Sequence, residues 1–164
     1  MLPNVRVTQL ARNSEKVKRF LKHYSIPVIS FEMNESTRTS QMAADVLGCS
    51  VAQIAKSIVF VSSDDKAVVV VISGDKRVDD KKLSKILGHK VTIADADAVR
   101  KHTGYVIGGV PPFPHNEDVA VFLDSSLSRF EEVWTSAGTP NSVFKISVEV
   151  LRRTLGTEFI EISD

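Results

Sequence analysis

The sequence predicts an α+β fold, a single domain with a mixed, largely antiparallel central sheet or partial barrel surrounded by helices. Helical patterns dominate its first half and closely spaced strand patterns its second, and no βα unit repeats, which argues against a doubly wound sheet. The 164 residues, 43% hydrophobic and 25% charged, suffice for one well-buried core and not for two. We therefore expect residues 1–164 to form one domain.

The N-terminal third predicts two helices with a strand between them. Apolar residues from Val17 to Tyr24 recur at i, i+3, i+4 and i+7 among basic residues, as in an amphipathic helix. A short strand over 28–31 follows. A second helix begins after Thr39 or Ser40, which can cap it, and ends at Gly48, which suits the left-handed position after a helix.

A hairpin is expected at the centre of the sheet. Ser50 and Gln53 form a capping-box pattern for one further turn, which delivers Lys56 to the edge of the next strand. The β-branched runs 57–61 and 67–72 are joined by a polar turn. Because the second run is continuously apolar, both of its faces should be covered.

The rest of the chain alternates short helices and strands. We expect a helix from Asp79 to Gly88 with Leu83, Ile86 and Leu87 inward, a strand at 91–93, a helix to His102 capped by Asp95 or Asp97, strands near 105–107, 119–123, 132–136 and 143–146, a helix over 148–155 between Ser147 and Gly156, and a terminal strand near 159–162.

Composition excludes several classes of protein. The net charge of +1 shows that a nucleic-acid partner must be held by a local patch. Cys49, the only cysteine, rules out an internal disulfide and a cysteine zinc cage, and is best explained as a small buried residue. The histidines have no ligand spacing, so we expect no metal and no cofactor. The longest apolar run is too short to span a membrane and residues 1–10 lack a signal-peptide centre, which predicts a soluble, cytoplasmic protein without a membrane partner.

Two features could carry chemistry. In the segment 103–115, Gly108 and Gly109 allow a close backbone approach and the following prolines stiffen the loop, so that free N–H groups could face a carbonyl or oxyanion. The alternative is a plain turn. Lys56, at the mouth of a strand, could hold a phosphate or polarise a carbonyl, although a lysine at such a boundary is commonly just solvated.

These segments resemble the YbaK/ProX family, free-standing aminoacyl-tRNA deacylases related to the editing domain of bacterial prolyl-tRNA synthetases. The resemblance runs from about the first helix to the last and preserves the order of the motifs. It rests on Thr39-Ser40-Gln41-Met42-Ala43-Ala44 with Leu47-Gly48, Gln53 to Phe60, Gly104-Tyr105 to Pro112, Asp124, Val133-Trp134 and Ala137-Gly138-Thr139-Pro140-Asn141.

The resemblance implies hydrolysis of the ester between a wrong, small amino acid and the terminal ribose of a tRNA. Lys56, Gly108 and Gly109 would be catalytic. Val110, Pro111, Asp124, Gly138 and His115 would bind substrate, although Asp124 could instead cap a helix. Pro114, where relatives often carry glycine, is a departure beside His115. No Ser-His-Asp triad is evident, and an activated ester needs only a positioned water or ribose hydroxyl and oxyanion stabilisation.

The expected substrate is tRNA-Pro carrying alanine, cysteine or serine, with prolyl-tRNA synthetase as a further partner. A non-catalytic module that binds tRNA, an aminoacyl group or a nucleotide for regulation is the alternative; a small-molecule esterase is disfavoured by the missing serine elbow. Basic residues that could contact tRNA, unless they are simply solvated, are Arg38, Lys76, Arg77, Lys81, Lys82 and Lys85.

Overall fold

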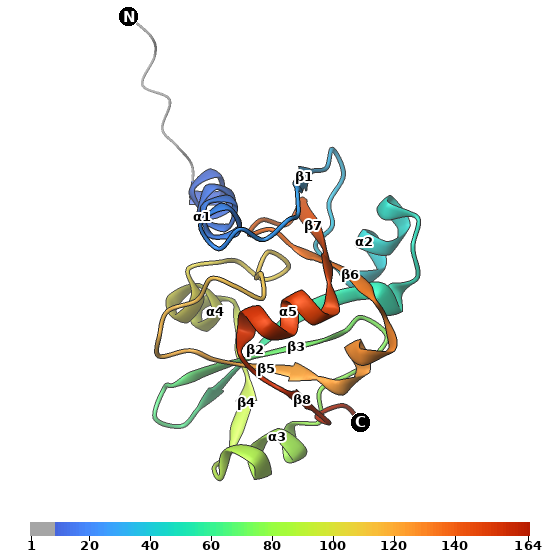
Figure 1. Ribbon diagram of the computed structural model, residues 1–164. Coiled ribbons are helices and arrows are strands. Elements are labelled where there is room, and N and C mark those ends of the chain that lie inside the picture. Colours follow the sequence, from blue (N-terminus) through green and yellow to red (C-terminus); the bar gives the residue numbers. More distant parts are fainter. Residues whose placement is uncertain (1–8) are drawn as a thin grey trace, which may run out of the picture.

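A mixed eight-stranded sheet with helices around it forms the protein (Figure 1), so the α+β prediction is confirmed. The computed structural model describes residues 9–164. The helices are α1 (Gln9–His23), α2 (Ser40–Leu47), α3 (Asp80–Leu87), α4 (Ala96–Thr103) and α5 (Val148–Leu155), with 3-10 turns at Val51–Gln53 and Ser125–Arg129. The strands are β1 (Ser30–Glu32), β2 (Ile54–Ser62), β3 (Ala67–Ser73), β4 (Val91–Ile93), β5 (Ala120–Asp124), β6 (Glu132–Ser136), β7 (Ser142–Ser147) and β8 (Phe159–Ile160).

The sheet is open and does not close into a barrel. Its order is β1-β7-β6-β2-β3-β5-β8, with β4 paired to β2 off this path. The β1–β7, β6–β7, β2–β3 and β2–β4 pairs are antiparallel, whereas β2–β6, β3–β5 and β5–β8 are parallel. Strand β2 therefore has different partners at its two ends on the edge that faces away from β3.

Apolar clusters cover both faces of the central hairpin, as its continuous valines predict. Every residue of β3 is buried. Val69 and Val71 pack into the larger cluster with Leu123 and Phe144, while Val70 on the opposite face joins a cluster around α3. The central strands form a rigid base because each buried aliphatic side chain stabilises the fold by about 1.5–3 kcal/mol.

The helix boundaries match the predicted caps, but two side chains that were expected on buried faces are exposed. Thr39, Asp79, Asp95 and Ser147 each accept a hydrogen bond from the first turn of their helix. Tyr24, predicted on the apolar face of α1, lies beyond the last turn and is 61% exposed because the chain reverses at Ser25, whose φ is 51°. Ile86, predicted inward, is 43% exposed because the short helix α3 buries only Leu83.

Four strand predictions differ from the structure by more than one residue. The strand expected over 28–31 is β1 at Ser30–Glu32. The predicted strand at 105–107 is a turn, since Gly104 is left-handed and buried Tyr105 donates its hydroxyl to the carbonyl of Pro114. Strand β2 begins at Ile54, so Lys56 lies within it and not before it. The terminal strand covers only Phe159–Ile160. None of the helices in the described range is long and apolar enough to cross a bilayer.

Candidate active site

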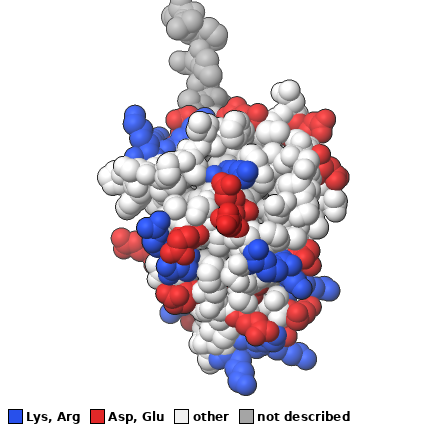
Figure 2. Space-filling view, turned by 45° about the vertical axis from the view of Figure 1, so that its right-hand side comes forward, with Lys and Arg blue, Asp and Glu red and all other residues white. Residues whose placement is uncertain are grey.

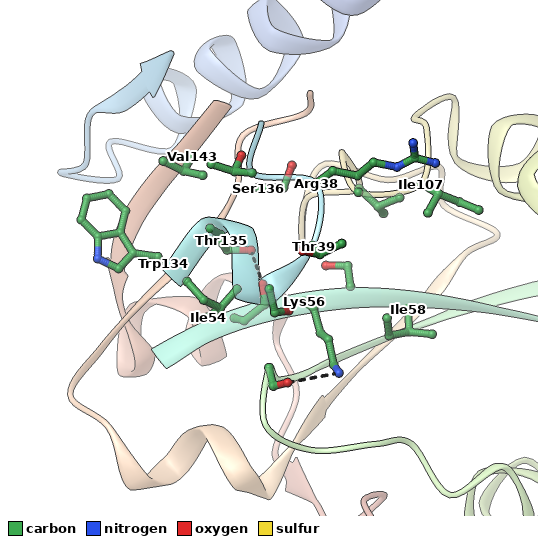
Figure 3. A pocket seen from close by; sticks show the side chains of 18 of the residues that line it. Arg38, Thr39, Ile54, Lys56, Ile58, Ile107, Trp134, Thr135, Ser136 and Val143 are labelled. Carbon is green, nitrogen blue, oxygen red and sulfur yellow. Dashed lines mark hydrogen bonds between the residues drawn. The ribbon is translucent and has the colours of Figure 1, made fainter. Parts of the chain in front are cut away.

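A gap in the sheet contains the cavity that forms the candidate site. On the edge away from β3, β2 pairs with β6 through Ile54 and Ala55 and with β4 from Phe60 onward. No strand of the described chain lies beside residues 56–59 on this edge. A cavity of about 550 Å³ fills this gap. Its walls come from β2, the segment 37–43 at the start of α2, the loop 107–110 and the end of β6 (Figure 3).

The unpaired edge of β2 points polar groups into the gap. Ile54 accepts a hydrogen bond from Gly74 N on the β3 side (2.7 Å), whereas Val59 accepts one from Ala94 N on the opposite side (2.9 Å). Since backbone groups alternate along an antiparallel strand, the N–H and C=O of Ser57 face the gap. The Ser57 hydroxyl is also buried and has no partner among the described residues. One residue therefore offers a donor, an acceptor and a hydroxyl.

Lys56 lines the same cavity and is half-buried. Its Nζ lies 3.5 Å from the carbonyl oxygen of Gly74, and it forms no ion pair with any residue from 9 to 164. Burial lowers the pKa of the Lys56 ammonium, the nearby Asp75 carboxylate raises it and Arg77 lowers it. An ammonium without a fixed counter-ion is available to an anionic or carbonyl oxygen of a ligand.

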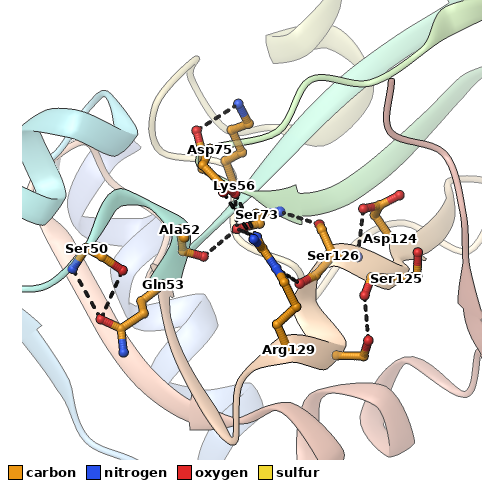
Figure 4. Close-up of polar contacts among 12 residues, drawn as sticks. Ser50, Ala52, Gln53, Lys56, Ser73, Asp75, Asp124, Ser125, Ser126 and Arg129 are labelled. Atoms are coloured by element: carbon orange, nitrogen blue, oxygen red, sulfur yellow. Dashed lines mark hydrogen bonds and ion pairs between the residues drawn. The ribbon is translucent and has the colours of Figure 1, made fainter.

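A polar network supports the turn below Lys56 (Figure 4). Arg129 donates Nη2 and Nη1 to the two carboxylate oxygens of Asp75 at 2.7 and 3.1 Å, and Nε to the carbonyl of Ser126 at 2.7 Å. The Arg129 guanidinium lowers the pKa of Asp75 to about 2. The Ser73 hydroxyl also bonds to Asp75 (2.8 Å) and to the carbonyl of Ala52. Because Arg129 engages Asp75, this carboxylate does not bind Lys56 directly.

The glycine loop packs its backbone tightly against neighbouring segments. Gly108 has a φ of +84°, and a Cβ there would lie 2.3 Å from Arg38 Cγ. A Cβ on Gly109 would lie 2.9 Å from the carbonyl carbon of Thr139, so this glycine is needed for packing and does not face the cavity. The Gly109 amide donates to the carbonyl of Val106 (2.8 Å). The amides of Gly108 and Val110, which both line the cavity, form no hydrogen bond with the described chain.

Four predicted substrate-binding residues lie outside the cavity lining: Pro111, His115, Asp124 and Gly138. The fully buried Asp124 accepts from the amides of Ser126 (2.9 Å), Ile162 (2.7 Å) and Ser163 (3.0 Å), which ties the C-terminal segment to β5. Gly138 has a φ of +104° and lies against the backbone of Asn13 on α1. In the structure Asp124 and Gly138 thus support the fold around the site.

His115 stabilises the glycine loop from behind. Its Nε2 lies 2.8 Å from the carbonyl oxygen of Pro111, its ring is edge-on to Tyr105, and Nδ1 is buried without a described partner. Because only an N–H can donate to this carbonyl, the proton is on Nε2 and Nδ1 is bare. Burial lowers the pKa of His115 to about 4, the hydrogen bond to Pro111 raises it and Lys16 lowers it. The imidazole is therefore neutral near pH 7.

The predicted tRNA-contacting cations are not all equivalent. Arg38 lines the cavity and is exposed, which places it at the entrance, and it carries no described ion pair. Lys82 donates to the carbonyl of Ser163 (2.7 Å) and lies 3.6 Å from Glu161, which commits it to the C-terminal segment. Figure 2 shows acidic and basic groups intermixed over one face. The remaining four cations, Lys76, Arg77, Lys81 and Lys85, are exposed.

Metal and thiol chemistry find no support in the described residues. No group of three or more His, Cys, Asp or Glu side chains between residues 9 and 164 could hold a metal ion. Cys49 lies outside the cavity lining, and burial raises the pKa of its thiol, which keeps it in the protonated, poorly nucleophilic form.

Sequence reasoning missed Ser57 and Trp134 as lining residues. Serine after lysine at the start of an apolar run carries no signal of its own, and the unpaired state of Ser57 follows from the partners that β2 lacks. The motif that contains Trp134 predicts no site role for it, although Trp134 lies at the cavity wall on β6 (Figure 3).

Comparisons with known proteins agree with one another. The family model for the aminoacyl-tRNA editing domain matches residues 34–154. The chain is 36% identical to the protein YwhH of Bacillus subtilis (strain 168), over 73% of this chain and 76% of that one. It is 26% identical to EbsC of Enterococcus faecalis (strain ATCC 700802 / V583), named as a candidate Cys-tRNA(Pro)/Cys-tRNA(Cys) deacylase, over 88% and 90%.

A solved structure shares the whole fold. The crystal structure of a candidate trans-editing enzyme for prolyl-tRNA synthetase superposes with a TM-score of 0.84 at 33% identity, covering 93% of this chain and 97% of the other. The agreement extends across both the sheet and its surrounding helices.

Proposed function

The chain belongs to the aminoacyl-tRNA editing domain family, and on this premise we propose that it is a trans-editing deacylase that hydrolyses mischarged aminoacyl-tRNA. The proposed substrate is tRNA-Pro esterified with a small wrong amino acid: alanine, cysteine or serine. Water attacks the ester carbonyl, the bond to the ribose oxygen breaks, and the products are the free amino acid and a tRNA with its terminal hydroxyl restored.

One observation carries the proposal. Among residues 9–164, every residue that lines the sheet-gap cavity lies between Thr37 and Val143, inside the segment 34–154 that matches the family model. The similarity therefore covers the complete cavity with its polar groups, and not only the scaffold.

Cavity groups can be assigned to the parts of the ester. The free amides of Gly108 and Val110 and the ammonium of Lys56 are the donors suited to the developing oxyanion. The carbonyl of Ser57 suits the α-ammonium of the amino acid, and the Ser57 hydroxyl suits the attacking water. An ester with a good leaving group needs positioning and charge stabilisation, so no protein nucleophile or metal enters this mechanism.

The same proposal predicts how the end of the tRNA is bound and where in the cell the protein acts. Arg38 would bind a phosphate near the acylated ribose, and a protein that acts on charged tRNA would work in the cytoplasm, alongside prolyl-tRNA synthetase. The name of the Enterococcus faecalis relative specifies a cysteinyl ester on tRNA-Pro, which is within the proposed amino-acid range.

Single-turnover deacylation tests the proposal. We expect the protein to hydrolyse Ala-, Cys- or Ser-tRNA-Pro and to leave Pro-tRNA-Pro intact. Lys56→Ala should slow the reaction by about a hundredfold, comparable to the loss of one oxyanion donor. Lys66→Ala, which removes an exposed lysine from the β2–β3 turn, is the matched control and should retain the parent rate. Tight tRNA binding without hydrolysis of any ester would instead establish the non-catalytic binding module.

A further inference from the structure

Two aromatic side chains lie beside the cavity on one face of the sheet. Val143 on β7 pairs in register with both Phe31 on β1 and Ser136 on β6, so these three residues form one row across the strands. Trp134 lies two residues from Ser136 and therefore on the same face. Val143, Ser136 and Trp134 line the cavity, and Phe31 does not. The row thus leads from the cavity wall to an aromatic ring just outside it.

The rings have a geometry suited to flat ligands. The centroids of Phe31 and Trp134 are 6.2 Å apart, with 58° between their planes, and Phe31 is 47% exposed. Lys145, opposite Trp134 in register, places Nζ 5.8 Å from the indole centroid. Lys145 is also 3.8 Å from Glu132, so part of its charge is already balanced. This surface therefore offers a ligand mainly the faces of two aromatic rings, together with the partly balanced charge of Lys145.

We propose that Phe31 and Trp134 form a stacking site for the unpaired bases that precede the acylated nucleotide at the end of the tRNA. This inference rests on the proposed function, because an acyl group in the cavity places its ribose at the entrance and the adjoining single strand next to the row. Bases of any sequence stack on aromatic rings, and Lys145 on one side with Arg38 at the entrance supplies positive charge for the phosphates.

A protein partner fits this surface less well. Two rings beside a cavity entrance expose far less than the roughly 800 Å² per partner that a stable protein interface buries. Strand β1 has only the residues Ser30–Glu32, which gives a partner strand little backbone to pair with. Single-stranded RNA needs no more than one or two ring faces per base.

Trp134 is the only tryptophan, so its fluorescence reports directly on the site. The probe is an uncharged RNA hairpin that mimics the acceptor stem with its unpaired 3′ end, compared with the same hairpin cut to a blunt end. We expect the first RNA to quench Trp134 emission and the blunt RNA to leave it nearly unchanged. Equal quenching by both, or quenching by neither, would overturn the proposal.

Variants separate stacking from folding. Phe31→Ala and Trp134→Leu should each weaken binding of the unpaired-end hairpin about tenfold, measured by anisotropy of labelled RNA, and leave the affinity for the blunt hairpin unchanged. Because Trp134 packs against the small cluster at α2, Trp134→Phe keeps a ring and should restore most of the affinity. Ile29→Ala, at a 72% exposed residue before β1, is the control. Equal losses of affinity for both RNAs would refute stacking. So would a parent protein that is a dimer and variants that are monomers, because the two rings would then serve a protein interface.

The outcome is distinguishable from failure of the proposed function. A protein that hydrolyses no aminoacyl-tRNA yet shows quenching that depends on the unpaired end would refute the deacylase and retain the stacking site. A protein that deacylates normally in the Phe31→Ala and Trp134→Leu variants, with unchanged RNA affinity, would retain the deacylase and refute the stacking site.

Discussion

Replacing His115 with glutamine should make the stability of the protein less sensitive to acid. The imidazole donates through Nε2 to the carbonyl of Pro111, while Nδ1 is buried without a described acceptor. Protonation would therefore place a second N–H in a site that cannot satisfy it, next to Lys16, whose Nζ lies over the Tyr105 ring. Glutamine can keep a donor for Pro111 and does not titrate.

The magnitude follows from linkage. The pKa of His115 falls from 6.5 to about 4 on folding, so the unfolded chain takes up the proton first as the pH decreases. The stability from the neutral imidazole is present above pH 6.5, decreases below it and is fully lost below about pH 4. Between pH 7 and pH 5 the loss from this one group is about 2 kcal/mol, on the scale of 1.36 kcal/mol per pKa unit.

Urea unfolding monitored by circular dichroism at several pH values between 7 and 5 measures this loss. Other groups titrate in the same range, so the decisive quantity is the difference in pH dependence between the parent protein and His115→Gln. The parent should lose about 2 kcal/mol more than the variant on going from pH 7 to pH 5. Parallel pH profiles for the two proteins would refute the burial of a neutral His115.

Three further predictions concern the loop, the metal and the charged helix. Gly108→Ala should reduce deacylation at least tenfold because its Cβ meets Arg38. The control Gly88→Ala, with a similar φ of +79° and no described atom within 4 Å of its Cβ, should lose only stability, and equal rates in both variants would contradict this. Deacylation should continue in EDTA, since the described residues hold no metal-ligand cluster; a complete loss that zinc reverses would be the opposite result. The double charge reversal Lys81→Glu/Lys85→Glu should lower the slope of log affinity for tRNA against log salt by about one per lost phosphate contact, with Lys66→Glu as the control. An unchanged slope would mean that these lysines are only solvated.

Local signals predicted most of the fold. Caps at Thr39, Asp79 and Ser147, and the continuous valines of β3, depend on neighbouring residues alone, so they can be read from the chain. The exposure of Tyr24 could not be predicted in this way, because it depends on the reversal of the chain at Ser25. The turn at 105–107 was missed because its β-branched composition suits a strand, while a tertiary hydrogen bond from Tyr105 to Pro114 selects the turn.

The candidate site was predictable only in part. Lys56 and Gly108 were identified from residue type and from a family resemblance, and the structure brings both to one cavity. Gly109 was expected to face a substrate, yet its missing side chain makes room for Thr139, a contact between segments far apart in sequence. Asp124, matched on its motif, caps the following 3-10 turn through the amide of Ser126, as the capping alternative predicted. It also accepts from the amides of Ile162 and Ser163, which lie next to it only in the folded chain.

Because the pairing of β2 is interrupted, the length of the cavity along β2 is set by the registers in which β6 and β4 pair with it. An exposed strand edge can normally pair with a strand of another chain. Here β6 and β4 occupy both ends of the edge, so the unpaired window is only about four residues, or roughly 13 Å, long. Moving the pairing of β4 along β2 would lengthen or shorten that window and would at the same time shift Ile93, which lines the cavity. Changes in substrate range could therefore arise from the register in which Val91–Ile93 pairs with β2, as well as from substitutions of side chains in the cavity wall.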